Sequence, residues 1–151
     1  MSTPDAHVCV AIEPAEIIVD ACAMNMVRNA NKLDVIVTEN LYGDILSDLG
    51  AGLVGGLGIV PGSNIGKDYA VFEAVHGTAP DIAGKGMANP TALVQSAIMM
   101  LFHMGETKAG EKLEKALIDH FREPSLRTPD LGGTATTMQF ADALANRVAT
   151  A

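Results

Sequence analysis

The sequence predicts an α/β fold with few strands and a helix-rich C-terminal half. Two observations predict it: compact apolar runs at residues 34–38 and 69–75, and apolar residues at helical spacing in the segments between and after them. The order strand, helix, strand, helix and then further helices indicates α/β layering. Only two or three strands are visible in the sequence, too few to form a sheet with both faces covered. We therefore expect the sheet to need strands that this chain does not supply.

The expected elements of the first half have local signatures. Residues 34–38 are β-branched at four of five positions, which is typical of a buried central strand. Leucine, isoleucine and valine recur at helical spacing from Ile45 to Val54. The predicted order is a short strand running into a helix at 16–23, the strand at 34–38, a turn at 40–43, and a helix that ends in the glycines of 55–58, followed by Pro61-Gly62.

The second half is predicted to be one strand, one long loop and three helices. The strand covers 69–75, and the glycine- and proline-rich loop covers 76–88. Asn89 is the expected N-cap and Pro90 the expected first residue of a helix that reaches about Met104. This helix is apolar almost all round, so we expect deep packing. An amphipathic helix at 106–121 and a last helix from about Thr136 complete the prediction.

Composition and charge exclude several function classes. Hydrophobic residues make up 48% of the 151, too many for a disordered chain, and the formal net charge is −8. Nucleic acids and anionic lipids attract clustered Lys and Arg, so neither is an expected partner. The two cysteines, Cys9 and Cys22, do not make a disulfide framework, so we expect a reducing compartment. Both are expected to be buried as small hydrophobic side chains. Without a signal-like segment or a membrane-length apolar run, we expect a protein of the cytoplasm or an organelle matrix.

A pair of aspartates opens the first chemical motif, at residues 40–48. Asp44 and Asp48 are four residues apart at a helix start, so their carboxylates share one face. Two like charges at this spacing favour a cation between them, and oxygen ligands suit Mg²⁺ or Mn²⁺. The alternative is that both simply complement the positive end of the helix dipole. Asp20 is a candidate third carboxylate or an ordinary turn residue.

Two glycine-rich stretches are the other candidates. The loop from His76 to Asn89 follows a strand and leads to a helix N-terminus, where backbone N–H groups can approach a phosphate closely. Its alternative is an ordinary long connection. The glycines of 52–58 do not have the G-x-G-x-x-G spacing and end a helix, so a Rossmann dinucleotide site is rejected.

Three stretches closely resemble the isocitrate/isopropylmalate dehydrogenase family. They are NLYGDILSD at 40–48, FEAVHGTAPDIAGKGMANPTA at 72–92 and TPDLGGTATT at 128–137. The resemblance covers residues 16–151, mainly the large cofactor-binding domain, whereas residues 1–15 are a non-matching N-terminal segment. It implies part of the family's three-layer αβα fold, which is unlike the Rossmann domain.

The resemblance also implies roles for individual residues. Asp44 and Asp48 match the family's metal-binding aspartates, and Asp20 resembles the carboxylate that reaches a neighbouring subunit's active site. The loop resembles the family's adenosine-binding loop, and the residues expected to bind the cofactor are His76, Gly77, Thr78, Ala79, Pro80, Asp81, Ile82 and Asn89. NADP-using relatives of the bacterial type carry Lys and Tyr where this chain has Asp81 and Ile82, so the implied cofactor is NAD.

The implied reaction is NAD-dependent oxidative decarboxylation of isocitrate to 2-oxoglutarate with Mg²⁺ or Mn²⁺. The stretches at 52–58 and 61–66 favour isocitrate, then homoisocitrate, over 3-isopropylmalate. The family's substrate-clamping Ser and Arg and proton-handling Tyr and Lys match nothing here, so no catalytic residue is assigned and no activity is expected of the chain alone. A non-catalytic nucleotide-binding or regulatory subunit is the alternative. We expect a homo-oligomer or completion by a missing N-terminal half.

Overall fold

A computed structural model describes residues 12–150. The chain divides into two compact units, Met1–Leu46 and Ser47–Ala151, and each is described by itself. The elements of the first unit are α1 (Val19–Arg28), a 3-10 turn η1 (Ala30–Lys32) and the beginning of α2 (Asn40–Val54). Cys22 is buried on α1, as predicted, whereas Cys9 lies outside the described residues.

Three sequence predictions for the first unit are wrong. Residues 12–18 form no strand, and α1 begins directly at Val19. The predicted central strand at 34–38 is likewise not a strand: the side chains of Val35 and Val37 are 81% and 92% exposed. A β-branched run becomes a strand only when a neighbouring strand offers its backbone N–H and C=O groups, and none in the described residues pairs with this run. The expected turn at 40–43 is instead helical, since the Gly43 N–H already donates to the Glu39 carbonyl oxygen at 2.9 Å.

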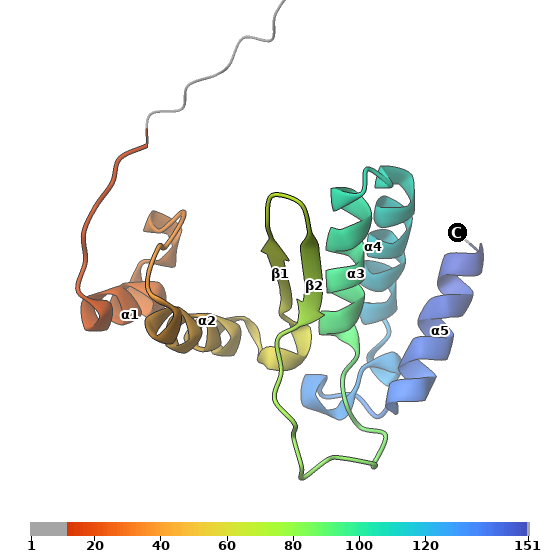
Figure 1. Ribbon diagram of the computed structural model, residues 1–151. Helices are drawn as coiled ribbons and strands as arrows, with labels where there is room; N and C mark the ends of the chain where they lie inside the picture. The colour runs from red at the N-terminus through yellow and green to blue at the C-terminus, as the bar shows by residue number, and fades with distance from the viewer. Residues whose placement is uncertain (1–11, 151) are drawn as a thin grey trace, which may run out of the picture. The chain divides into compact units, whose positions relative to one another are not determined.

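The second unit contains a hairpin and three long helices (Figure 1). Its elements after α2 are η2 (Leu57–Ile59), β1 (Pro61–Ile65), β2 (Ala70–Ala74), α3 (Thr91–His103), α4 (Thr107–Phe121), η3 (Pro124–Leu126), η4 (Pro129–Leu131) and α5 (Thr137–Thr150). The strand at 69–75, the loop at 76–88 and the three helices after it are thereby confirmed, to within one or two residues. The predicted α/β class is also confirmed.

The two strands form an antiparallel hairpin in which Pro61 pairs with Ala74 and Ile65 with Ala70. The sequence did not predict β1, because Pro61 and Gly62 are typical of a turn. Proline is nevertheless tolerated at the first residue of a strand and on an edge strand. Helix α3 packs on both strands. The buried Ser96 hydroxyl of α3 lies 2.6 Å from the Glu73 carbonyl oxygen of β2 and donates to it.

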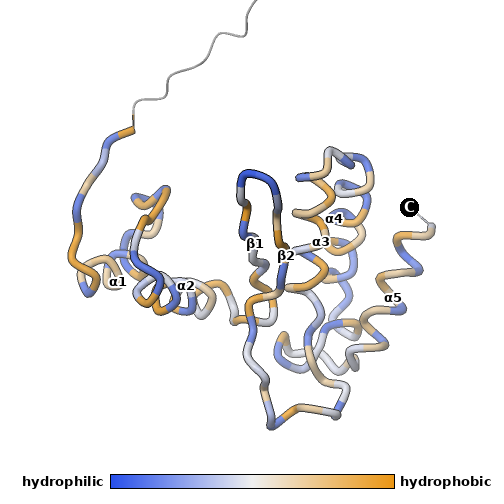
Figure 2. The backbone as a smooth tube through the Cα atoms, in the orientation of Figure 1, coloured by the Kyte–Doolittle hydropathy of each residue, from blue (hydrophilic) through white to orange (hydrophobic). Residues whose placement is uncertain are grey.

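The core of the second unit lies among α3, α4 and α5. Its buried residues are Ile98, Ala116, Leu117, Phe140 and Leu144. Figure 2 shows apolar residues along α3, polar residues interleaved along α4 and a hydrophilic hairpin tip. The expected deep burial of α3 on all sides is wrong, because Leu93 is 61% exposed. Its buried positions Thr91, Ala92, Ser96 and Ile98 form one face.

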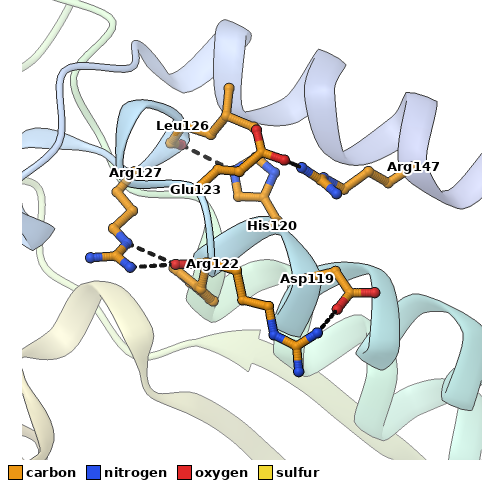
Figure 3. Close-up of polar contacts among 8 residues, drawn as sticks. Asp119, His120, Arg122, Glu123, Leu126, Arg127 and Arg147 are labelled. Carbon is orange, nitrogen blue, oxygen red and sulfur yellow. Dashed lines mark hydrogen bonds and ion pairs between the residues drawn. The ribbon is translucent and has the colours of Figure 1, made fainter.

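Polar contacts fasten the chain where it turns from α4 toward α5. Figure 3 shows the Arg127 side chain pointing back to the end of α4, where Nε and Nη2 donate to the Phe121 carbonyl oxygen at 2.9 and 2.5 Å. Arg147 of α5 forms an ion pair with Glu123. These bonds hold the segment that leads into the TPDLGG stretch.

Candidate nucleotide site

The loop between β2 and α3 contains two consecutive tight turns. The Ile82 N–H donates to the Ala79 carbonyl oxygen at 3.1 Å, and the Lys85 N–H donates to that of Ile82 at 3.1 Å. Ala79 has a φ of 41°, which L-residues rarely adopt, while Gly84 and Gly86, at 75° and 63°, adopt it without steric cost. The backbone therefore takes a defined path that the glycines of this stretch permit.

This loop carries nearly all the predicted cofactor residues on the surface of the second unit. The exposed ones are His76, Gly77, Thr78, Ala79, Pro80, Asp81 and Ile82. The His76 ring Nδ1 lies 3.0 Å from the Gly77 carbonyl oxygen and, since a carbonyl only accepts, donates to it in this geometry. The Asp81 carboxylate is exposed and is an acceptor for a ligand hydroxyl.

Asn89 occupies the end of the loop and is more enclosed than the rest. Its Oδ1 accepts from the Thr91 N–H at 3.0 Å and from the Thr91 hydroxyl at 2.6 Å. The first helical residue is Thr91 and the N-cap is Pro90, so the predicted N-cap is one residue too early. The side chain of Asn89 nevertheless satisfies a backbone donor at this helix start, which is the purpose of a cap.

The TPDLGGTATT stretch holds the same loop from a distant part of the sequence. Asn89 Nδ2 donates to Asp130 Oδ2 at 2.8 Å, across 41 residues. The Thr137 N–H donates to the Gly86 carbonyl oxygen at 2.8 Å, and the Thr137 hydroxyl donates to that of Ala88 at 2.6 Å. Figure 1 shows the loop projecting beside the start of α5. Sequence reasoning found this stretch but gave it no role.

The predicted metal ligands lie on two helices. Asp20 is exposed in the first turn of α1, where its Oδ1 accepts from the Ala21 N–H at 2.6 Å. Asp44 and Asp48 are exposed and one turn apart in α2, and Asn40 Nδ2 donates to Asp44 Oδ2 at 3.2 Å. Among residues 12–150, no group of three or more His, Cys, Asp or Glu side chains gathers around one point. Two carboxylates one helical turn apart suit a hard divalent cation that keeps water or substrate in its other positions.

Comparison with known proteins gives a consistent answer. The family model of isocitrate/isopropylmalate dehydrogenases matches residues 5–144. The isocitrate/homoisocitrate dehydrogenase of Thermus thermophilus is 61% identical over 129 residues, which cover 85% of this chain and 38% of that protein. The mitochondrial isocitrate dehydrogenase (NAD) subunit alpha of Sus scrofa is 51% identical over 144 residues, covering 95% of this chain and 39% of that protein.

A solved structure matches the fold as well. The isocitrate dehydrogenase from Methylococcus capsulatus superposes with a TM-score of 0.82 and 53% sequence identity, covering 87% of this chain and 40% of that one. The chain thus spans about two fifths of the length of these relatives. No helix in the described part of the chain is long and apolar enough to cross a membrane. Because the family model matches most of the chain, the chain belongs to the isocitrate/isopropylmalate dehydrogenase family.

Proposed function

We propose that this chain forms the NAD-binding and divalent-metal-binding part of an isocitrate dehydrogenase. The reaction is the oxidative decarboxylation of isocitrate to 2-oxoglutarate with Mg²⁺ or Mn²⁺. The observation that carries the proposal is the loop between β2 and α3, which presents Asp81 on the surface and ends at the anchored Asn89. The relatives from Thermus thermophilus and Sus scrofa, whose names include isocitrate dehydrogenase, support the substrate class.

The choice of NAD over NADP depends on Asp81. Its exposed carboxylate is an acceptor for a ribose 2′-hydroxyl, whereas a 2′-phosphate would meet a like charge and no donor. Ile82 beside it is 37% exposed and offers no hydrogen-bonding group to a phosphate. The pair therefore favours NAD, because Asp81 attracts the 2′-hydroxyl of its ribose and repels the 2′-phosphate of NADP.

Calorimetric titration of the 151-residue chain with NAD and NADP tests this choice. We expect NAD to bind at least about tenfold more tightly, because one repelled charge costs on the order of 1.4 kcal/mol or more. Replacing Asp81→Lys together with Ile82→Tyr should reverse the preference.

Asp68→Lys is the matched control for net charge, because Asp68 is exposed at the hairpin tip, away from the loop in sequence. This variant should keep the preference for NAD. Equal binding of both nucleotides to the unchanged chain would contradict the choice of NAD, and no binding of either would contradict the nucleotide site itself.

The proposed metal ligands from this chain are Asp44 and Asp48 of α2. When bound, Mg²⁺ or Mn²⁺ supplies Lewis-acid stabilisation of the negative charge that develops on a substrate oxygen as CO₂ leaves. Asn40 donates to Asp44 and so restrains one carboxylate. Asp20 is proposed to serve the active site of a neighbouring subunit.

Titration with Mn²⁺, in which electron paramagnetic resonance measures the free ion, tests the metal ligands. We expect Asp44→Asn or Asp48→Asn to weaken binding by about tenfold or more, since each removes one charged oxygen ligand. Asp142→Asn, on the exposed face of α5, is the control and should leave binding unchanged. Equal Mn²⁺ affinity in all three variants would overturn the assignment of the two aspartates as metal ligands.

Within the family, isocitrate is proposed ahead of homoisocitrate, and 3-isopropylmalate last. The Thermus thermophilus relative carries both of the first two substrates in its name, which supports placing them ahead of 3-isopropylmalate. The other candidate, a non-catalytic nucleotide-binding subunit, is less favoured because such subunits often lose the metal-site aspartates, and Asp44 and Asp48 are both present.

A further inference from the structure

We propose that Asp130 is a positioning residue for the nucleotide site, which fixes the Asn89 side-chain amide so that it donates to the bound cofactor. Thr137 acts with it by holding the backbone of the loop just before Asn89. The inference rests on the proposed function, since it assumes that this loop binds a nucleotide. It gives a role to the TPDLGGTATT stretch, which contains none of the proposed metal ligands and lies outside the loop itself.

The orientation of the Asn89 amide follows from its partners. The Thr91 N–H can only donate, so the atom that faces it at 3.0 Å must be the acceptor Oδ1. The Asp130 carboxylate can only accept at neutral pH, so the atom that faces it at 2.8 Å must be the donor Nδ2. One partner on each side therefore excludes the flipped amide.

Counted over residues 12–150, the Asn89 side chain has one N–H hydrogen without a partner. Its Oδ1 already accepts twice, from the Thr91 backbone and hydroxyl, and one Nδ2 hydrogen is used by Asp130. The other hydrogen is left for a ligand. The site thus recognises an acceptor atom, such as an unprotonated ring nitrogen of adenine, and not an amino group at that point.

Three separate segments converge on this amide. Besides Asp130 and Thr91, the 3-10 turn η2 comes so close that a Cβ placed on Gly58 would lie 3.3 Å from Asn89 Cβ and 3.4 Å from Asp130 Oδ2. Thr137 binds the loop backbone twice, through Gly86 and Ala88. The end of the loop is therefore held on several sides, while its exposed beginning is held mainly by its own turn.

The test compares three variants of the 151-residue chain. Asp130→Ala removes the acceptor, Asp130→Asn keeps an acceptor oxygen without the charge, and Asp142→Ala removes an exposed carboxylate on α5. We expect Asp130→Ala to weaken NAD binding by about tenfold, the effect of losing one charge-assisted hydrogen bond. Asp130→Asn should recover most of the affinity, and Asp142→Ala should change nothing.

Amide hydrogen exchange without nucleotide provides a readout that does not depend on NAD. Exchange in the peptide that covers residues 85–90 should be faster in Asp130→Ala and close to normal in Asp130→Asn. Thr137→Val should also speed it, whereas Thr107→Val should not, because Thr107 lies at an exposed position in the first turn of α4. The urea midpoints of all variants establish whether a change is local.

The outcomes separate the two claims. If the unchanged chain fails to bind NAD, the proposed function fails, and the exchange data alone decide whether Asp130 orders the loop. If the chain binds NAD and Asp130→Ala binds it equally well, the positioning role is overturned. It is also overturned if Asp130→Asn is as weak as Asp130→Ala, because an acceptor oxygen would then not be what Asn89 needs.

Discussion

At the residue scale, His120 is a titratable side chain that the second unit buries completely. Its ring is fully buried, with the Phe140 ring centroid at 4.1 Å. Nε2 lies 3.0 Å from the Leu126 carbonyl oxygen, so the neutral ring carries its hydrogen there (Figure 3). Nδ1 has no partner among the described residues, so a second proton would bury an unpaired N–H.

Burial lowers the pKa of His120 below its ordinary value of 6.5, and nearby Arg147 lowers it further, while the Leu126 hydrogen bond and Glu123 act in the opposite direction. As the pH falls, His120 therefore takes up a proton at a higher pH in the unfolded chain than in the folded chain. The stabilising contribution is complete above pH 6.5 and is lost as the pH falls from there through the folded pKa.

We predict that His120→Gln reduces the loss of stability on acidification. The measurement is the free energy of unfolding in urea at about pH 7.5 and about pH 5.5. Glutamine does not titrate in this range, so the fall should be smaller than in the unchanged chain. His76→Gln, at an exposed position, is the control and should retain the full fall. An identical fall in His120→Gln would show that this ring is not responsible.

At the scale of elements, the turn of the TPDLGG stretch has a strict steric requirement. Gly132 has a φ of 74° and ends η4, as a glycine commonly does. A Cβ on Gly133 would lie 2.0 Å from the Arg127 carbonyl oxygen, which is well inside contact distance. The Ala135 N–H donates to that same oxygen at 2.9 Å, so the two backbone segments cannot separate without breaking this bond.

We predict that Gly133→Ala destabilises the chain by at least about 2 kcal/mol, because a backbone segment has to move to admit the methyl group.

Gly52→Ala is the opposite case. Gly52 lies inside α2, and its Cβ would meet nothing within 4 Å, so alanine should stabilise the helix by about 0.5–1 kcal/mol. Urea unfolding of both variants tests the pair. Equal effects on stability would mean that the close approach at Gly133 is relieved at no cost.

At the scale of the whole molecule, exposed apolar side chains are numerous. In the first unit they include Val35, Val37 and Leu41, with Leu41 64% exposed. In the second unit they include Val71 of β2 and Leu93 of α3. Large apolar side chains exposed in this number favour contact with other polypeptide. It supports the expectation of a homo-oligomer or of completion by a further part of the enzyme.

We predict that the purified 151-residue chain produces no NADH from isocitrate and Mn²⁺. The chain spans 38% of the length of its Thermus thermophilus relative, and the substrate-clamping arginines implied by the family resemblance match no residue here. A substrate with several carboxylates needs such cations as well as the metal. The absorbance of NADH measures the reaction. Metal-dependent NADH formation that disappears in Asp44→Asn would contradict this prediction.

The sequence by itself determined the helices and the family. Helix α4 follows from its amphipathic spacing and α2 from the recurring leucines and glycine stop, because both signals act over a few residues. The three motifs carried the family assignment, and the loop at 76–88 followed from its glycines and prolines. The ligand roles of Asp20, Asp44, Asp48 and the loop residues stay predictions.

Only the tertiary structure decided which extended segments become strands and what holds Asn89. Residues 34–38 have the more strand-like composition, yet Pro61–Ile65 forms the strand because β2 lies beside it. The link from Asn89 to Asp130 joins residues 41 apart. Strand pairing and side-chain hydrogen bonds of this kind depend on a partner that is distant in the chain, and local propensity contains no information about where that partner lies.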